Sequence, residues 1–136
     1  MATLENTTEE GLARFASATS RVEKPWGYEH IYAVTPEYCG KLLFVRAGEA
    51  LSMQLHRLKD ETIYVHSGRA QFEIGESPNH LESAVVGPED SFHIRPGVVH
   101  RVLALEDTLL LEVSTPHLDD VVRLEDRYGR EGTSEP

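Results

Sequence analysis

Histidine, glutamate and glutamine side chains occur at a spacing that could bind a metal ion. In the segment LSMQLHR (51–57), the alternation of a β-strand places Gln54 and His56 on one face. Glu61 follows after a short turn, and His100 comes from a later strand. Two imidazoles, one carboxylate and one amide oxygen would form a mixed nitrogen and oxygen site for one divalent transition metal: Zn, Mn, Fe or Ni. The alternative is a structural strand whose polar face, with Gln54 and His56, meets solvent.

The elements that must position these side chains are short β-strands. Apolar and polar residues alternate in nine runs, separated by turns rich in Gly and Pro: 27–34, 39–47, 51–57, 61–67, 69–75, 80–87, 90–96, 98–105 and 107–114. Residues 117–130 are expected to add a short strand or a 3₁₀ turn. Many short strands at even spacing predict an all-β sandwich or barrel. No long segment with an apolar period of ~3.6 residues, which would indicate a helix, lies between these runs, so βαβ units are not expected.

The chain is predicted to form a single domain. It has 136 residues, and 13 Lys+Arg against 23 Asp+Glu give a formal net charge of −10. This length is that of one domain with its own core. We expect a flexible or partly helical N-terminal arm at 1–22, the β domain at 23–130 and a flexible tail at 131–136.

Composition also limits the partners. Basic residues are scattered among acids, which argues against a nucleic-acid partner. No run approaches the ~18 apolar residues needed to cross a bilayer, and the acidic N-terminus resembles neither a secretory nor a transit signal. We therefore expect a cytoplasmic protein without membrane association. The single Cys39 excludes an intramolecular disulfide and a multi-cysteine zinc site.

The candidate ligands fall within two segments that resemble the motifs of the cupin family. GEALSMQLHRLKDETIYVHSG (48–68) is similar to G-x5-H-x-H-x3–4-E-x6-G, with Gln where the first His is usual. EDSFHIRPGVVH (89–100) is similar to G-x5-P-x-G-x2-H. The resemblance implies a cupin-type jelly-roll β-barrel that holds a metal inside and is often dimeric. The motif positions imply the same four ligands: Gln54, His56, Glu61 and His100.

Four segments resemble more closely the C-terminal domain of type II phosphomannose isomerases: KPWGYEHIY (24–32), LSMQLHR (51–57), HIRPGVVHRV (93–102) and LEVSTPHLDDVVRLEDRYGR (111–130). The hallmark of that family is Q-x-H-x-H-R-x-E-H. The matching stretch QLHRLKDET keeps the Gln, the first His and the Glu, but has Leu58, Lys59 and Thr62 at the second His, the Arg and the last His. The resemblance implies metal-dependent isomerisation of mannose 6-phosphate or a related sugar phosphate.

Those isomerases usually carry a GDP-mannose pyrophosphorylase domain in front of the cupin domain. Here the resemblance begins at Lys24, so we expect no such domain and no nucleotidyl transfer.

Five further residues are candidates for the site. Glu112 and Arg123 are the catalytic candidates, and Glu112 interrupts an otherwise apolar run, TLLLEVS. Lys41, Lys59 and Arg101 are candidates for binding an anionic part of the substrate. Arg101 directly follows a candidate ligand, so alternation sends it to the opposite face, and Lys59 is expected to be solvated in its turn. Surface ion pairs are the alternative for Lys41 and Arg123, and a solvent-facing carboxylate is the alternative for Glu112.

Three functions stay open at this level. The first is a metal-dependent isomerase or epimerase that acts on a sugar or a sugar phosphate. The second is a stand-alone metallo-cupin with other small-molecule chemistry, such as that of an oxygenase, decarboxylase, dehydratase or cyclase. The third is a cupin that binds a ligand without turnover. We also expect a homodimer, because Leu51, Met53 and Leu55 would form an apolar outer face that needs a cover. A second subunit or the N-terminal arm could supply that cover.

Overall fold

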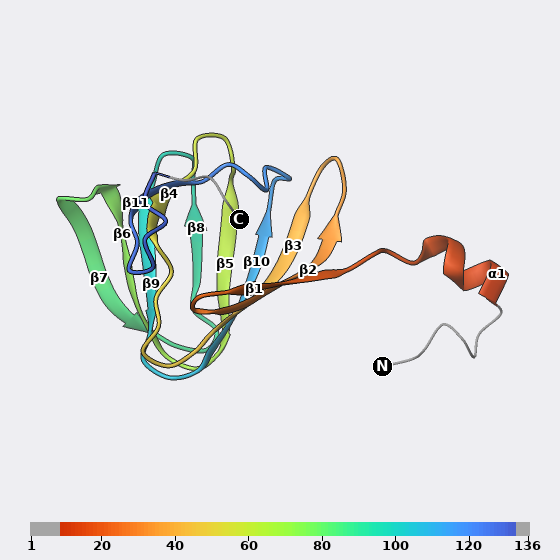
Figure 1. The fold of residues 1–136 in the computed structure, drawn as a ribbon, viewed down its shortest axis with the longest axis horizontal. Coiled ribbons are helices and arrows are strands. Elements are labelled where there is room, and N and C mark those ends of the chain that lie inside the picture. Colours follow the sequence, from red (N-terminus) through yellow and green to blue (C-terminus); the bar gives the residue numbers. More distant parts are fainter. Residues whose placement is uncertain (1–8, 133–136) are drawn as a thin grey trace.

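The computed structural model describes residues 9–132. Within that range a short helical segment precedes eleven strands: α1 (Glu9–Leu12), η2 (Ala13–Phe15), β1 (Ser20–Lys24), β2 (Gly27–Val34), β3 (Cys39–Val45), β4 (Met53–Leu55), β5 (Glu61–Ser67), β6 (Ala70–Ser77), β7 (His80–Val86), β8 (Ser91–Ile94), β9 (Val99–Ala104), β10 (Thr108–Ser114) and β11 (Val122–Glu125). They form two sheets, in the orders β1-β2-β3-β10-β5-β8 and β11-β4-β9-β6-β7 (Figure 1). The paired strands are antiparallel.

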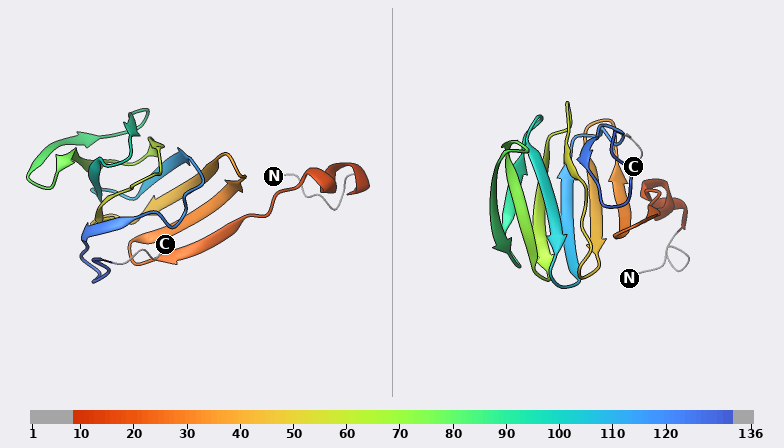
Figure 2. Two further views of the ribbon diagram at one scale, coloured as in Figure 1. Left: turned by 90° about the horizontal axis from the view of Figure 1, so that it is seen from above. Right: turned by 60° about the vertical axis from the view of Figure 1, so that its left-hand side comes forward.

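The two sheets curve around one interior, as the turned views in Figure 2 show. Alternation along each strand sends one face inward. The apolar part of the interior is a cluster of twelve buried residues: Trp26, Leu43, Val45, Ile63, Val65, Ala70, Phe72, Val86, Ile94, Val102, Ala104 and Leu110. This cluster is the hydrophobic core that stabilises the barrel.

The inward face changes from apolar to polar along three central strands. On β5 the inward series runs from Val65 to Glu61, and on β10 it runs from Leu110 to Glu112. On β9 His100 follows Val102 and Ala104 on the buried face. Because β10 pairs with β5 in antiparallel register, Leu110 lies opposite Val65. The polar residues of these strands are therefore gathered in the interior beyond the apolar core.

The all-β prediction is confirmed, and the predicted strands are present with ends shifted by a few residues. The structure adds β1, which pairs with β2 and begins inside the segment predicted as an arm. That arm also contains α1 and η2, which extend away from the barrel (Figure 1). The predicted element within 117–130 is the strand β11. Residues 1–8 of the predicted arm and 133–136 of the predicted tail lie outside the described residues.

The predicted apolar outer face at 51–55 is wrong for two of its three residues. Strand β4 begins only at Met53, so Leu51 lies before the strand and packs against the core cluster. Met53 is paired with Glu125 of β11 and is 5% exposed. These two residues therefore need no second subunit as a cover, and the homodimer stays a prediction.

Candidate metal centre

Residues from three strands bring the candidate ligands together. Gln54 on β4 lies directly opposite His100 on β9 in the antiparallel register, so both side chains share one face. Glu61 is the first residue of β5, and His56 follows the end of β4. The backbone N–H of Gly97 donates to the carbonyl of His56 over 2.7 Å, which ties the two motif segments to each other.

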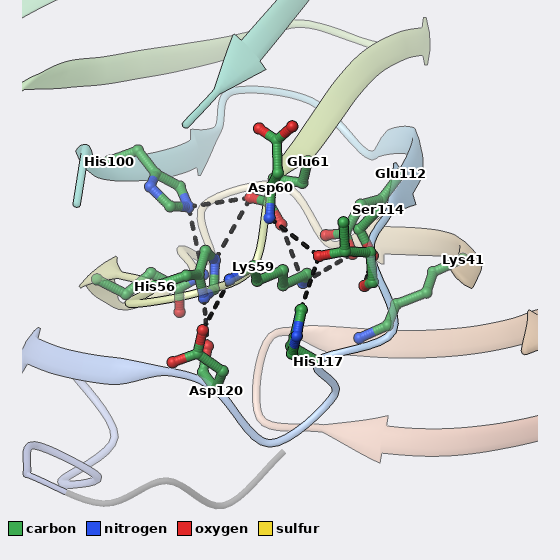
Figure 3. A network of polar contacts seen from close by, with 12 residues as sticks. Lys41, His56, Lys59, Asp60, Glu61, His100, Glu112, Ser114, His117 and Asp120 are labelled. Carbon is green, nitrogen blue, oxygen red and sulfur yellow. Dashed lines mark hydrogen bonds and ion pairs between the residues drawn. The ribbon is translucent and has the colours of Figure 1, made fainter. Parts of the chain in front are cut away.

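His56, Glu61 and His100 form a buried cluster in the barrel interior (Figure 3). Their exposed fractions are 3%, 3% and 2%. Glu61 Oε1 lies 3.5 Å from His56 Nε2 and 3.3 Å from His100 Nε2. The structure thus unites three of the four predicted metal ligands around one carboxylate oxygen.

Backbone carbonyls fix how each imidazole presents its nitrogens. His56 Nδ1 lies 2.6 Å from the carbonyl oxygen of Asp120, and His100 Nδ1 lies 3.1 Å from that of Val98. A carbonyl only accepts hydrogen bonds, so each Nδ1 carries the hydrogen and donates it. In the neutral form of each ring, Nε2 then presents a lone pair towards Glu61. Metal-binding histidines in proteins are commonly oriented in this way, because the ring nitrogen that does not bind the metal donates a hydrogen bond to a carbonyl or a carboxylate.

A divalent transition metal fits this cluster. A nitrogen lone pair that faces a carboxylate oxygen is repelled by it unless a cation, either a proton or a metal ion, lies between the two atoms. His56 Nε2 and Glu61 Oε1 are buried and lack a hydrogen-bond partner. Ligand atoms bound at ~2.1 Å around a tetrahedral ion lie ~3.4 Å apart, which matches the observed separations of 3.3 and 3.5 Å. Two histidines with one carboxylate suit Fe, Mn, Ni or Zn.

Gln54 lies beside the cluster with its amide nitrogen towards it. Its Nε2 is 3.5 Å from His100 Nε2, and its Oε1 accepts a hydrogen bond of 2.8 Å from the Ser52 hydroxyl. A half-turn of the amide exchanges its oxygen and nitrogen, and the Ser52 hydroxyl can accept from an amide as well as donate to it. Gln54 is therefore placed to offer an oxygen as a fourth ligand after this half-turn.

The expectation that Lys59 is solvated is wrong. The residue is 5% exposed, and its Nζ lies 2.9 Å from Glu61 Oε2 and 2.9 Å from Glu112 Oε2. Burial opposes the charged form, but the two carboxylates outweigh burial and raise the pKa of Lys59 above its usual value. Lys59 is therefore a buried ammonium that joins a candidate metal ligand to a candidate catalytic carboxylate.

Asp120 explains why Lys59 turns inward. Its carboxylate accepts backbone N–H groups from Arg57, Leu58 and Lys59 over 3.0, 2.6 and 2.8 Å. These bonds outweigh the effect of partial burial and lower the pKa of Asp120. They also fix the turn between β4 and β5 so that Leu58 is 66% exposed while the next residue enters the barrel.

Glu112 lies in the same interior on β10 and is 5% exposed. Burial and the charge of Glu61 raise its pKa, and the ammonium of Lys59 opposes that shift. A buried carboxyl whose pKa is raised is better suited to exchange protons near neutral pH than a solvated one. The structure therefore favours a buried, paired Glu112 over the solvent-facing alternative.

A pocket opens beside the cluster and is rich in cations. Its lining includes Gln54 and His56 of the candidate metal set. It also includes five cationic side chains: Lys24, Lys41, Lys59, Arg123 and Arg130. The acidic lining residues are Glu29, Glu112 and Asp120. More cations than acids therefore line the pocket of a chain whose net charge is −10, and two further acids outside the lining, Glu61 and Asp126, pair with Lys59 and Arg130.

Lys41 and Arg123 are both in this pocket, and both are 6% exposed. Lys41 forms a close ion pair with Glu29, which also pairs with Lys24 over 3.3 Å. Burial opposes ionisation of Glu29, but the two ammonium groups outweigh it and lower the pKa of that carboxyl. The alternative of surface ion pairs is therefore wrong for these two residues, because both lie in the interior.

We expect Glu29→Gln to destabilise the protein by about 3 kcal/mol at pH 7, because it leaves Lys24 and Lys41 buried beside one another without a counter-charge. The lowered pKa sets the sign of the pH dependence. The stabilisation is complete above the unfolded-state pKa of about 4.3 and is lost as pH falls through the lower folded-state value. Urea unfolding at pH 7 and at a pH below the folded-state pKa of Glu29 measures the difference in unfolding free energy between the unaltered protein and the variant. A gap as wide under acidic conditions as at pH 7 would contradict this origin.

Arg101 is not brought into the cluster. It lies on the outward face of β9, where its Nη2 is 3.1 Å from Glu73 Oε1 and its Nη1 is 3.4 Å from Glu125 Oε1. This is the face that alternation predicts for it. The structure therefore offers no support for Arg101 as a substrate-binding residue.

Four charged residues of the pocket were missed by the sequence analysis: Lys24, Glu29, Asp120 and Arg130. The sequence contains one usable signal for Glu29, because it occupies an inward position in a strand where buried and more exposed residues alternate. Lys24 ends the polar strand β1, and Asp120 lies in a loop between β10 and β11. No periodicity marks those two positions, and only the assembled barrel brings them to the pocket.

An antiparallel two-sheet barrel with such a polar cluster inside it is the fold of a cupin. Solved structures share it. KdgF from Halomonas sp. matches with a TM-score of 0.62 and 23% identity, over 83% of this chain and 93% of that one. Bacillus subtilis oxalate decarboxylase matches with a TM-score of 0.66 and 20% identity, over 77% of this chain and 30% of that one. The predicted cupin-type jelly-roll barrel is thereby confirmed.

Among the cupins, the chain belongs to the family described as "Mannose-6-phosphate isomerase C-terminal", which matches residues 13–126. Curated relatives include the xanthan biosynthesis protein XanB of Xanthomonas campestris, 34% identical over 118 residues. Another is the mannose-1-phosphate guanylyltransferase ManC of Salmonella typhimurium, 32% identical over 114 residues. They cover 81% and 80% of this chain, which spans only 24% and 23% of their lengths. Within residues 9–132, no helix is long and apolar enough to cross a membrane.

Proposed function

We propose that this protein is a metal-dependent isomerase that acts on a sugar phosphate, with mannose 6-phosphate as the first substrate to test. One observation carries the proposal. The lone pairs of His56 and His100 converge on Glu61 beside a cation-lined pocket, in a chain of the mannose-6-phosphate isomerase C-terminal family. The resident metal in this proposal is one divalent ion held by His56, Glu61 and His100, with Gln54 as a fourth ligand. The solved structure of oxalate decarboxylase, a protein with Mn(II) centres and the same fold, supports Mn among these candidates.

The proposed reaction moves a hydrogen between adjacent carbons of an aldose and a ketose. A bound divalent metal would supply a Lewis acid that polarises the carbonyl and holds two neighbouring substrate oxygens. We assign the transfer of the proton to Glu112, whose raised pKa and place in the pocket lining support that role. Arg123 cannot be the base, because a guanidinium keeps its proton in proteins. We assign it to the anionic part of the substrate.

The cationic side of the pocket supports a phosphorylated substrate. Lys41 and Arg123 are both buried in its lining, and Lys24 and Arg130 are further positive groups there. A phosphate would be attracted by these groups and would take up part of the pairing now made with Glu29 and Asp126.

We also propose that the protein is a cytoplasmic homodimer without a nucleic-acid partner. Tyr32, Val34 and Val113 support the dimer, since they are 40%, 52% and 55% exposed on strands β2 and β10, which flank β3 in one sheet. The scatter of basic residues outside the pocket argues against binding of a nucleic-acid backbone.

A second candidate function is supported by the ligand types themselves. Two histidines and one carboxylate with open positions are the set used by Fe(II) oxygenases. If iron were the resident metal, oxygen uptake with a candidate substrate would be the reaction to measure. The dehydratase, decarboxylase and cyclase alternatives have no feature in the pocket that favours them over isomerisation.

We expect the protein, purified without an affinity tag, to carry about one transition metal per chain and to convert mannose 6-phosphate into fructose 6-phosphate. Metal content is measured by mass spectrometry, and conversion by proton NMR. Incubation with a chelator should remove both the metal and the activity, and adding one divalent metal back should restore them. Full activity of metal-free protein would contradict the proposal. Oxygen uptake without isomerisation would favour the second candidate.

A further inference from the structure

The two oxygens of Glu61 have different surroundings. Oε1 faces the two imidazoles at 3.3 and 3.5 Å, whereas Oε2 lies 2.9 Å from the ammonium of Lys59 (Figure 3). Lys59 is itself held from the other side by Glu112, also at 2.9 Å. One carboxylate oxygen is thus directed at the candidate metal position, and the other is already occupied by a buried cation.

The position of Lys59 is imposed by the fold. The carboxylate of Asp120 binds the backbone N–H groups of three successive residues in the turn, and Lys59 is the last of them. Its side chain is 6% exposed, so water offers little competition for the ammonium. A lysine fixed at its backbone and paired at its tip restrains the rotation of the carboxylate that it contacts.

We infer that Lys59 is a positioning residue that makes Glu61 a one-oxygen ligand and thereby tunes which metal the site prefers. This role rests on the proposed metal site and deepens it. With Oε2 held by Lys59, Glu61 offers only Oε1, which suits the four-coordinate geometry that Zn(II) adopts. Released from Lys59, the carboxylate can turn and offer both oxygens, and Mn(II) suits sites richer in oxygen ligands.

The test compares the affinities of Zn(II) and Mn(II) in the same variant. Loss of a positive charge strengthens the binding of every divalent ion, so a single affinity confounds charge with geometry. The ratio of the two affinities cancels that shared effect. We expect Lys59→Met to lower the Zn(II) affinity relative to Mn(II) by about tenfold, the scale on which partners of metal ligands act. The electron paramagnetic resonance spectrum of bound Mn(II) should change in the same variant.

Two further variants isolate the contact. Lys59→Arg keeps a cation that can hold Glu61 Oε2. It should therefore retain the Zn(II)-to-Mn(II) affinity ratio and the Mn(II) spectrum of the unaltered protein. Lys41→Met removes another buried lysine of the same pocket, whose ion pair is with Glu29, and should leave both unchanged. Because Lys59→Met leaves Glu61 and Glu112 close together and can impair folding, Lys59→Met with Glu112→Gln provides a charge-balanced version.

The outcomes separate this role from the proposed function. If the unaltered protein binds neither Zn(II) nor Mn(II), both the metal site and the role of Lys59 are overturned. If it binds metal and Lys59→Met, alone or with Glu112→Gln, keeps the original ratio and spectrum, only the role of Lys59 is overturned. A ratio shifted equally by Lys41→Met would also overturn it, because the effect would then belong to pocket charge in general.

Discussion

We expect His100→Ala to lower the metal affinity at least ~100-fold and to abolish isomerisation, while the barrel still folds. The reason is the geometry around Glu61. Removal of His100 deletes one of the two imidazole ligands that face Glu61 Oε1. The ligands that remain, His56 and Glu61 with Gln54, hold a transition metal much less tightly against water. Metal content by mass spectrometry and turnover of mannose 6-phosphate measure the two effects.

Thermal unfolding gives an independent measure of the same loss. A ligand that binds only the folded state at 100 times its dissociation constant stabilises that state by about 2.7 kcal/mol. Added metal should therefore raise the melting temperature of the unaltered protein and leave that of His100→Ala unchanged. His56→Ala should behave in the same way.

The matched control for these variants is His66→Ala. His66 lies on β5, the strand that begins with Glu61, but it is exposed on the other face. We expect this variant to keep its metal, its activity and its thermal shift. Equal losses of metal and activity in His66→Ala and in His100→Ala would show that the losses do not depend on the position of the histidine. That result would rule out the interior cluster as their cause.

The strands were predictable because their inward faces alternate. On β5 the buried positions are every second residue, and the same period extends along β9 and β10. The missed strand β1 has the sequence SRVEK and buries little of itself. It is held by its register with β2 rather than by its own pattern, so hydrophobic periodicity gives no sign of it.

The site was predictable in part for the same reason. Glu112 was a candidate because it interrupts an apolar strand, and alternation within the strand places it inside. The direction of Lys59 was not predictable, since an aspartate 61 residues later in the chain fixes its turn. The same applies to the pairing of Lys59 with Glu112, which lies on the distant strand β10. Local pattern therefore identifies side chains that enter the barrel, but the contacts that tune them are set by distant segments.

We expect Glu112→Gln to reduce kcat by about 10²- to 10⁴-fold while the metal content stays unchanged. Glutamine keeps the shape of the side chain and an oxygen for Lys59, but it cannot take up a proton. Because a base works in its ionised form, the activity of the unaltered enzyme should fall as pH drops through the pKa of Glu112, which lies above the usual glutamate value of about 4.3. That acidic fall should be absent from the residual activity of the variant.

Glu73→Gln is the control for this substitution, since Glu73 pairs with Arg101 on the outer face of the barrel. It should leave kcat and the pH profile unchanged. Retained kcat in Glu112→Gln would remove Glu112 from the proton transfer and would leave it as the counter-charge of Lys59. A variant that lost its metal together with its activity would instead place Glu112 in the support of the metal centre, because Lys59 and Glu61 connect it to that centre.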